Sequence, residues 1–222
     1  MTALILHYAP DNASLCVRLA LEWLREPYVT SLVDRSQNGQ KSPDYLKLNP
    51  HGLIPALETP NGPMFETGAI LLWLADRHPG KIFPTVGDPK RAAALSWLFW
   101  MSNTFHPALR MLFYPDKYLP AAPSSLRHAT RFQIVAHLDR LEAHWSADHV
   151  LHFCYLAPML RWPAIYGGST AGYDLAHWPR LHRFAQVFED TATVRCVARA
   201  EGLGATPFSA PTLPTPPEGS AT

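Results

Sequence analysis

The chain has 222 residues, of which 47% are hydrophobic and 17% are charged, so it is long enough for two small domains that each bury a core. The 19 lysines and arginines nearly balance the 18 aspartates and glutamates, and the net charge of +1 provides no long-range field for nucleic acid or an anionic membrane. We therefore expect no nucleic-acid partner and no membrane partner. An anionic ligand would have to be held by local groups.

The cysteines and histidines argue against a disulfide framework and a metal site. Cys16, Cys154 and Cys196 lie far apart and form no CxxC pair, which suits a reducing compartment. His149 and His152 have neither an HExxH pattern nor a cysteine partner, so we expect no metal. The sequence shows no signal-peptide pattern, and no window reaches the roughly 20 apolar residues of a membrane span. These features predict a cytoplasmic protein.

The first eighty residues change their hydrophobic period in an order typical of an α/β unit. Apolar and β-branched runs predict strands over 4–8, 28–33, 54–58 and 63–65, and helical spacing predicts helices over 15–23, 42–48 and 67–78. The strand–helix–strand crossover implies parallel pairing, whereas the Pro-Asn-Gly turn at 60–62 implies an antiparallel hairpin. We therefore predict an α/β N-terminal domain over 1–79, thioredoxin-like, with a mixed four-stranded sheet.

The second half of the chain shows helical patterns and no strong strand. Residues 80–88 are rich in Pro and Gly and are interpreted as a linker to an all-α, helical domain over 89–202. Helical patterns cover 90–113, 124–145, 149–162, 178–189 and 191–200. The composition of 203–222 predicts a Pro-rich disordered tail, either idle or docking a partner through its PxxP-like stretch.

Three stretches resemble one known family. They read YAPDNASL at 8–15, NPHGLIPAL at 49–57 and ETGAI at 66–70. With the helical half that follows, the sequence resembles the cytosolic glutathione S-transferase family over about residues 3–200, closest to bacterial beta-class members. The resemblance implies glutathione as co-substrate, a small electrophile as second substrate, and a homodimer in which the N-terminal domain of one subunit meets the helical domain of the other.

The second stretch falls where the family has a cis-proline. A cis Ile54–Pro55 bond would turn the backbone N–H and C=O of Ile54 outward, to pair with the cysteinyl part of glutathione as an added strand does. The alternative is an ordinary trans proline that starts an edge strand. With the surrounding motif present, we expect the cis form.

Further contacts to glutathione are expected from two other segments. Thr67 lies where a helix N-cap is expected, so its hydroxyl and the first-turn N–H groups could hold a carboxylate, and Glu66 could pair with the γ-glutamyl amine. Capping alone is the other interpretation of Thr67. For the glycyl end, Lys41 and Gln40 are the contacts expected by position, unless this loop is only a solvated surface.

The residue that activates the thiol is left open by the sequence. The beta-class cysteine falls on Ala13, so a mixed disulfide between glutathione and this position is impossible. Ser14 could donate to the thiolate or cap the helix, and Asn12 could supply its amide or be only a turn residue. Tyr8 could donate from the end of the first strand or be packed in the sheet, and Cys16 is interpreted as a small core residue.

The helical half offers a candidate second wall for the site. His106 falls where beta-class relatives place a histidine facing the glutathione sulfur, and it could polarise the thiol or a leaving group. Arg110, Met111 and Tyr114 follow within two turns and are predicted to line an electrophile pocket, with plain core packing as the alternative for Met111 and Tyr114. The family's capping box is replaced here by His149 and His152, so the start of that helix is the least secure part of the predicted fold.

The sequence is compatible with three functions. The first is a glutathione S-transferase that conjugates glutathione to small electrophiles, with possible glutathione-dependent disulfide reductase activity. The second is a non-catalytic glutathione-binding protein of the same fold. Ala13 and the altered capping box favour this function. The third is a thioredoxin-type redox protein, against which the absence of CxxC counts. We expect the enzyme, because the residues that would bind and orient a thiol are present.

Overall fold

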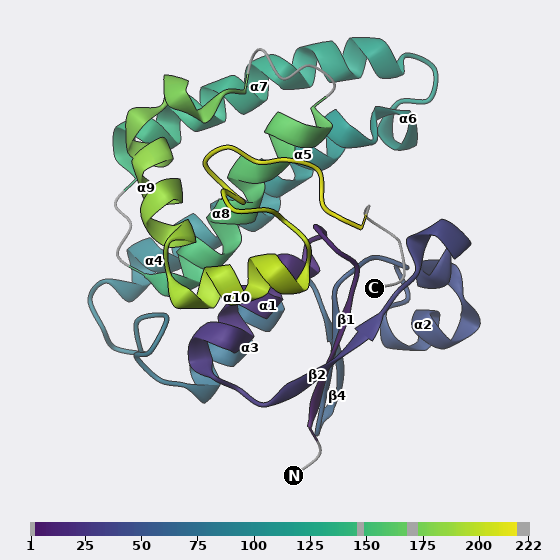
Figure 1. Ribbon diagram of the computed structural model, residues 1–222, viewed down its shortest axis with the longest axis vertical. Helices are drawn as coiled ribbons and strands as arrows, with labels where there is room; N and C mark the ends of the chain where they lie inside the picture. The colour runs from purple at the N-terminus through teal and green to yellow at the C-terminus, as the bar shows by residue number, and fades with distance from the viewer. Residues whose placement is uncertain (1–2, 146–148, 168–172, 217–222) are drawn as a thin grey trace.

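The computed structural model describes residues 3–145, 149–167 and 173–216. Its single sheet has the strand order β2-β1-β3-β4. β1 (Leu4–Tyr8) pairs in parallel with β2 (Tyr28–Leu32) and antiparallel with β3 (Ala56–Thr59), which pairs antiparallel with β4 (Gly62–Phe65). The predicted mixed four-stranded sheet is confirmed, and it lies at one end of the molecule, with the long helices at the other (Figure 1).

Alternating side chains of the strands bury the two faces of this sheet against different helices. Leu6 and Leu57 belong to the large core cluster that also contains the apolar residues of α1 (Ser14–Leu24) and α3 (Thr67–Arg77). Ala56, on the opposite face from Leu57, packs with Tyr45 of α2 (Pro43–Leu48) in a separate cluster. The short 3-10 turns η1 (Arg35–Gln37) and η2 (Gly39–Lys41) lead from the sheet into α2.

The rest of the described chain is helical, as the sequence predicts. Its elements are α4 (Arg91–Trp100), the π-helical segment η3 (Met101–Phe105), α5 (His106–Phe113), α6 (Pro115–Tyr118), α7 (Pro123–His144), α8 (Val150–Tyr166), η5 (Leu175–His177), α9 (Pro179–Glu189) and α10 (Ala192–Ala200). The right-handed backbone at the junctions joins α4, η3 and α5 into one long rod. None of the described helices is long and apolar enough to cross a membrane.

The start of α8 is fixed by contacts that replace the missing capping box. His149 occupies the cap position without a side-chain cap hydrogen bond. The N–H of Leu151 instead donates to the carbonyl of Ile82 in the linker, at 3.0 Å, and the ring of His152 lies 2.9 Å from the carbonyl of Ala94. The linker therefore satisfies a helix-start N–H group that a side chain usually satisfies.

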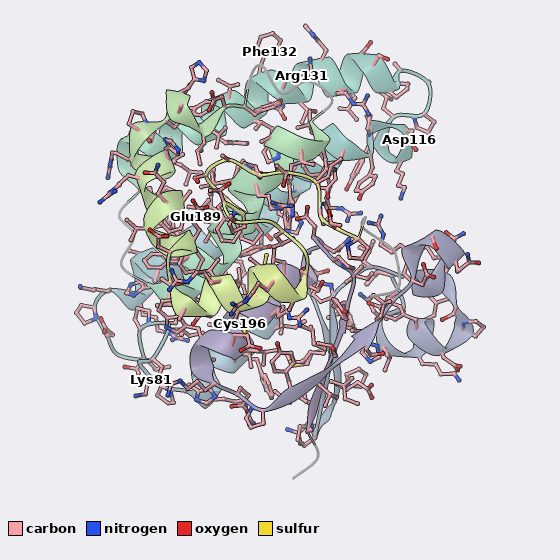
Figure 2. The ribbon with its side chains drawn as sticks, viewed as in Figure 1. Lys81, Asp116, Arg131, Phe132, Glu189 and Cys196 are labelled. Carbon is pink, nitrogen blue, oxygen red and sulfur yellow. The ribbon has the colours of Figure 1, made fainter. Side chains whose placement is uncertain are left out.

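The predicted disorder of the tail is wrong for residues 203–216. In Figure 1 this segment, in yellow, runs back across the helical domain after α10. Phe208 is buried and stacks on Phe188 at a centroid distance of 5.9 Å. The backbone N–H groups of Phe208 and Ser209 donate to Glu189, which Figure 2 labels. Buried partners thus order a segment whose composition alone indicates disorder, and residues 217–222 lie outside the described part of the chain.

Candidate functional site

A cavity of about 630 Å³ lies between the sheet domain and the helices. The loop between β1 and α1, the loop before β3, the start of α3 and the η2 segment form one wall. Side chains of η3, α5, α6 and α8 form the other. Both an apolar and a polar surface therefore meet in one cleft, as in ligand sites of this size.

The loop between β1 and α1 brings Asn12 and Ala13 to the cavity. Asp11 adopts a left-handed φ of 52°, after which the Asn12 carbonyl accepts from Leu15 and the Asn12 Oδ1 accepts from the N–H of Ala13 at 2.8 Å. The first turn of α1 follows directly, so its positive dipole end lies beside Asn12. Of the three polar side chains considered for the thiol, Asn12 lines the cavity.

Ser14 and Tyr8 have other surroundings. Ser14 has no exposed surface, and its hydroxyl donates to the carbonyl of Ala9 at 3.2 Å and accepts from the N–H of Ala9. It is the first residue of α1, behind a cap at Ala13, so it is not the cap. Tyr8 is packed in the core below the guanidinium of Arg18, which lies 5.2 Å from its ring. Neither side chain lines the cavity.

Cys16 behaves as the core residue that the sequence predicts. Its side chain is fully buried, and burial raises the pKa of the Cys16 thiol well above its usual value. A thiol held in its protonated form has little nucleophilic character. Cys16 therefore packs the core and offers no reactive thiolate to the cavity.

The loop before β3 contributes backbone groups. The Ile54–Pro55 bond is cis, which confirms that prediction, and both residues line the cavity. The sheet pairing of β3 starts only at Ala56, so Ile54 lies outside the ladder. The carbonyl of Leu53 accepts from the Tyr45 hydroxyl and from the Asn49 amide, each at 2.7 Å, and these bonds hold the loop in place.

Glu66 and Thr67 both line the cavity at the start of α3. The cap position is Glu66, with a φ of 69°, so the prediction that Thr67 is the cap is off by one residue. The reason is that the left-handed backbone at Glu66 lets the helix begin at the next residue, Thr67. Thr67 is buried in the first turn, where helix N–H groups point away from the helix body and favour an anion.

Gln40 and Lys41 line the cavity from η2. Within the described ranges, the buried Gln40 Oε1 has no hydrogen-bond partner. Lys41 Nζ donates to the carbonyl of His51 at 3.3 Å. Gly52, with a φ of 61°, makes this packing possible, because a Cβ there would lie 2.7 Å from Lys41 Nζ and 2.8 Å from the Gln40 carbonyl.

His106 faces the cavity from the start of α5. Its Nδ1 lies 3.1 Å from the hydroxyl of Tyr155, and its ring packs against Tyr155 and Trp162 at centroid distances of 5.8 and 5.5 Å. Burial, and then the nearby charge of Arg110, lowers the pKa of His106 to about 4. The imidazole is therefore neutral at pH 7 and acts through hydrogen bonds, not charge.

Arg110 and Tyr114 line the cavity as predicted, whereas Met111 does not. Successive helix residues are about 100° apart, so Met111 points away from the stripe that carries His106 and Arg110. Arg110 Nε donates to the Tyr118 hydroxyl at 3.1 Å. This hydrogen bond fixes the guanidinium at the rim of the cavity.

The sequence interpretation missed a buried charge cluster behind the Asn12 loop. The carboxylate of Asp11 accepts from Arg161 Nε at 2.8 Å, from Trp162 Nε1 at 3.0 Å and from the Tyr166 hydroxyl at 2.6 Å. Tyr155, Trp162 and Tyr166 all line the cavity from α8. Their spacing of seven and four residues is the signal that could have placed them on one helix face.

Arg161 joins this cluster to the C-terminal segment. Its Nη1 and Nη2 atoms donate to the carbonyls of Pro207 and Thr212 at 2.9 and 2.7 Å. The Asp11–Arg161 ion pair has no exposed surface. Across the described ranges, no group of three or more His, Cys, Asp or Glu side chains is placed to hold a metal ion.

Comparisons with known proteins agree with this architecture. The family model for the glutathione S-transferase N-terminal domain matches residues 13–77. A glutathione S-transferase of Xanthomonas campestris, GST-4.5, is 30% identical over 89% of this chain and 98% of its own. The disulfide-bond oxidoreductase YfcG of Escherichia coli is 30% identical over 79% of this chain and 85% of its own.

A solved structure shows the same fold. The crystal structure of a glutathione transferase homologue from Sulfitobacter with bound glutathione superposes with a TM-score of 0.80, at 25% identity, over 90% of this chain and 99% of that one. A thioredoxin-like domain followed by an all-α domain, with a cavity between them, is thus the fold of glutathione transferases. The chain belongs to the glutathione S-transferase family and is a glutathione transferase similar to the bacterial beta class.

Proposed function

We propose that the chain conjugates the thiol of glutathione to small electrophiles and that Asn12 helps to hold the thiol as a thiolate. The observation that carries the proposal is the position of Asn12 and Ala13 at the positive end of α1, on the same cavity as the Ile54–Pro55 loop. A free thiol has a pKa of about 8.5, so a hydrogen-bond donor and a helix dipole are what the chemistry needs.

The opposite ends of glutathione have matching groups along the N-terminal wall. The backbone of Ile54 pairs with the cysteinyl part, and the first turn of α3 at Thr67 holds the γ-glutamyl carboxylate. Glu66 pairs with the γ-glutamyl amine. Lys41 holds the glycyl carboxylate, and the unpartnered Oε1 of Gln40 accepts an N–H of the ligand. In this assignment the amine and the glycyl carboxylate each have a partner of opposite charge, and the γ-glutamyl carboxylate has the N–H groups of a helix start.

His106 assists from the helical wall. Because its Nδ1 contacts the Tyr155 hydroxyl, its Nε2 is the ring nitrogen left to meet the sulfur or a leaving group. A neutral imidazole can donate or accept one hydrogen bond there. Ser14 and Tyr8 have no direct part in this scheme, since their side chains do not line the cavity.

Glutathione-dependent disulfide reduction is a second candidate activity, favoured by the similarity to the oxidoreductase YfcG. Ala13 provides no sulfur, so both electrons must come from two glutathione thiols, which leave as oxidised glutathione while the substrate disulfide becomes two thiols. The same thiolate at Asn12 would make the first attack.

We further propose a homodimer in which the outer surface of the helical domain of one subunit meets the N-terminal domain of the other. Phe99 of α4 and Phe132 of α7 are 55% and 66% exposed. Figure 2 shows Phe132 projecting outward from α7. Large apolar side chains on an outer face are typical of protein–protein contacts. Sedimentation of wild type and of a Phe99→Asp variant would test this, since the proposal predicts that the charge shifts the chain toward monomer.

The test of the enzyme is to measure glutathione affinity, conjugation of 1-chloro-2,4-dinitrobenzene and reduction of a glutathione mixed disulfide side by side. We expect Asn12→Ala to lower the conjugation kcat by roughly tenfold to a hundredfold while the affinity changes little. Asn61→Ala, the same substitution in an exposed turn, is the matched control and should leave kcat unchanged. Tight glutathione binding by wild type with no turnover on either substrate would instead identify a binding protein.

A further inference from the structure

The helical wall of the cavity carries positive charge that the glutathione scheme does not use. We call the side chains of Arg110, Tyr114, Lys117 and Tyr118 the cationic wall. Two cations lie close to the ring of Tyr114, with the Lys117 Nζ 4.6 Å and the Arg110 guanidinium 5.9 Å from its centroid. Aromatic faces stabilise cations at such distances without neutralising their charge.

Little negative charge is available to balance the cationic wall. Among the described residues that line the cavity, the acids are Asp11 and Glu66. Asp11 is completely buried and paired with Arg161, and Glu66 lies on the other wall at α3. Asp116, next to Lys117 on α6, is exposed and does not line the cavity (Figure 2). The wall therefore presents a net positive field to whatever lies beside the glutathione sulfur.

The geometry of Arg110 favours a planar anion. Its Nε is engaged by the Tyr118 hydroxyl at 3.1 Å, and no hydrogen bond to another described residue occupies its two terminal amino groups. Paired guanidinium N–H groups match the two oxygens of a carboxylate. Phe113, Trp162 and Tyr166 line the same cavity and add aromatic surface, which suits a flat ring.

We propose that the second substrate is an aromatic electrophile that carries a carboxylate, with the carboxylate on Arg110 and Lys117 and the ring among the aromatic side chains. This inference rests on the proposed function, since it needs the thiolate at Asn12. In the reaction the glutathione sulfur bonds to the ring carbon that carries a halogen, the carbon–halogen bond breaks, and halide and the thiol proton are released. No oxidant or reductant is required.

A second glutathione molecule also carries carboxylates, and it is the other source of the same chemistry. It lacks an aromatic ring, and the aromatic side chains that line the cavity would then meet an extended polar peptide. The observations therefore favour the aromatic acid. A comparison of a ring substrate with oxidised glutathione distinguishes the two sources.

The test compares kcat/KM for 4-chloro-3-nitrobenzoate and for its neutral analogue 4-chloro-3-nitrobenzamide, each divided by its uncatalysed rate with glutathione. Wild type should prefer the benzoate by about tenfold, the value of one charge-assisted hydrogen bond. Arg110→Gln should bring this ratio close to one, and Lys117→Gln should lower it by a smaller factor. Arg183→Gln, the same substitution on the exposed face of α9, should keep the wild-type ratio.

Three results would overturn the inference. A wild-type preference for the benzamide, or a ratio that Arg110→Gln leaves unchanged, would show that the cationic wall does not bind the carboxylate. Competition by oxidised glutathione that is lost in Arg110→Gln, with an unchanged aryl ratio, would assign the wall to a second glutathione. If neither ring substrate reacts although glutathione binds, the proposed transferase activity itself is wrong. This outcome differs from a change in the benzoate-to-benzamide ratio, which tests the cationic wall alone.

Discussion

The two walls of the cavity are built in different ways. The N-terminal wall uses backbone groups and helix starts, at Ile54, Asn12 and Thr67, and these come from three short sequence motifs. The helical wall uses side chains from α5, α6 and α8 that are up to 60 residues apart in the sequence. The first wall suits one invariant ligand with a peptide backbone, whereas the second can change its specificity one side chain at a time.

Removing the Asp11–Arg161 ion pair, which connects the two walls, should have the largest effect on stability. Arg161→Met leaves the carboxylate of Asp11 buried without its cation, so we expect the free energy of unfolding to fall by about 3–5 kcal/mol. Urea denaturation measures this value. Arg183→Met, on an exposed face, is the control and should change stability by less than about 0.5 kcal/mol. A loss below about 1 kcal/mol for Arg161→Met would show that the ion pair does not join the walls.

The C-terminal segment should contribute next. Phe208→Ala removes a buried ring that stacks on Phe188, and we expect a loss of about 3 kcal/mol in unfolding free energy. Leu213→Ala lies in the same segment, but its side chain is 65% exposed and its loss should be close to zero. Equal effects of the two substitutions would mean that the segment is not packed as described.

Acid should weaken the helical domain through its buried histidines. Burial lowers the pKa of His152 to about 4, as it does that of His106, whereas an unfolded histidine titrates near pH 6.5. The unfolded state therefore binds more protons between these values, and stability falls as pH drops from about 6.5 toward 4. Between pH 7 and pH 5 each histidine should cost about 2 kcal/mol.

The pH effect has its own control. His152→Asn removes one titrating group, so the stability of the variant should depend less steeply on pH than that of wild type. The difference between pH 7 and pH 5 should be about 2 kcal/mol, the contribution of one histidine. Thermal or urea unfolding at several pH values gives both curves. Parallel curves for the two proteins would mean that His152 does not contribute to acid sensitivity.

The smallest effect is expected for a substitution in the N-terminal wall that changes the affinity for glutathione. Gly52→Ala should raise the dissociation constant for glutathione by about tenfold, because the new Cβ displaces Lys41 and the Gln40 carbonyl. Gly62→Ala also introduces a side chain at positive φ, but nothing lies within 4 Å of it, so affinity should not change. Calorimetric titration distinguishes the two. A loss of affinity in both variants would indicate general strain instead of a local effect.

Much of the fold could be predicted from the sequence because its signals are local. The strand and helix periods, the Pro-Asn-Gly turn and the cis bond at Ile54–Pro55 all depend on neighbouring residues. The ordered segment 203–216 could not be predicted, since it depends on Glu189 and Arg161, which are distant in the sequence. Composition describes a segment but not the partners that satisfy its backbone.

The site shows the same division. The sequence indicates Asn12 and His106 as candidates, but it does not distinguish Asn12 from Ser14, because two polar residues only two positions apart at a helix start can point in different directions. The structure separates them through the Ser14 hydrogen bonds to Ala9. The prediction that Met111 lines the pocket together with Arg110 and Tyr114 fails for a similar reason, since a single step of about 100° along α5 turns its side chain away from the cavity.

The most direct measurement is the pKa of the glutathione thiol in the complex, followed by thiolate absorbance at 240 nm as pH is raised. We expect wild type to lower this pKa by at least about one unit from its free value near 8.5, and Asn12→Ala to reverse most of the shift. Glutathione that binds wild type with an unshifted pKa, or an Asn12→Ala complex that keeps the full shift, would contradict the claim that Asn12 and the start of α1 activate the thiol.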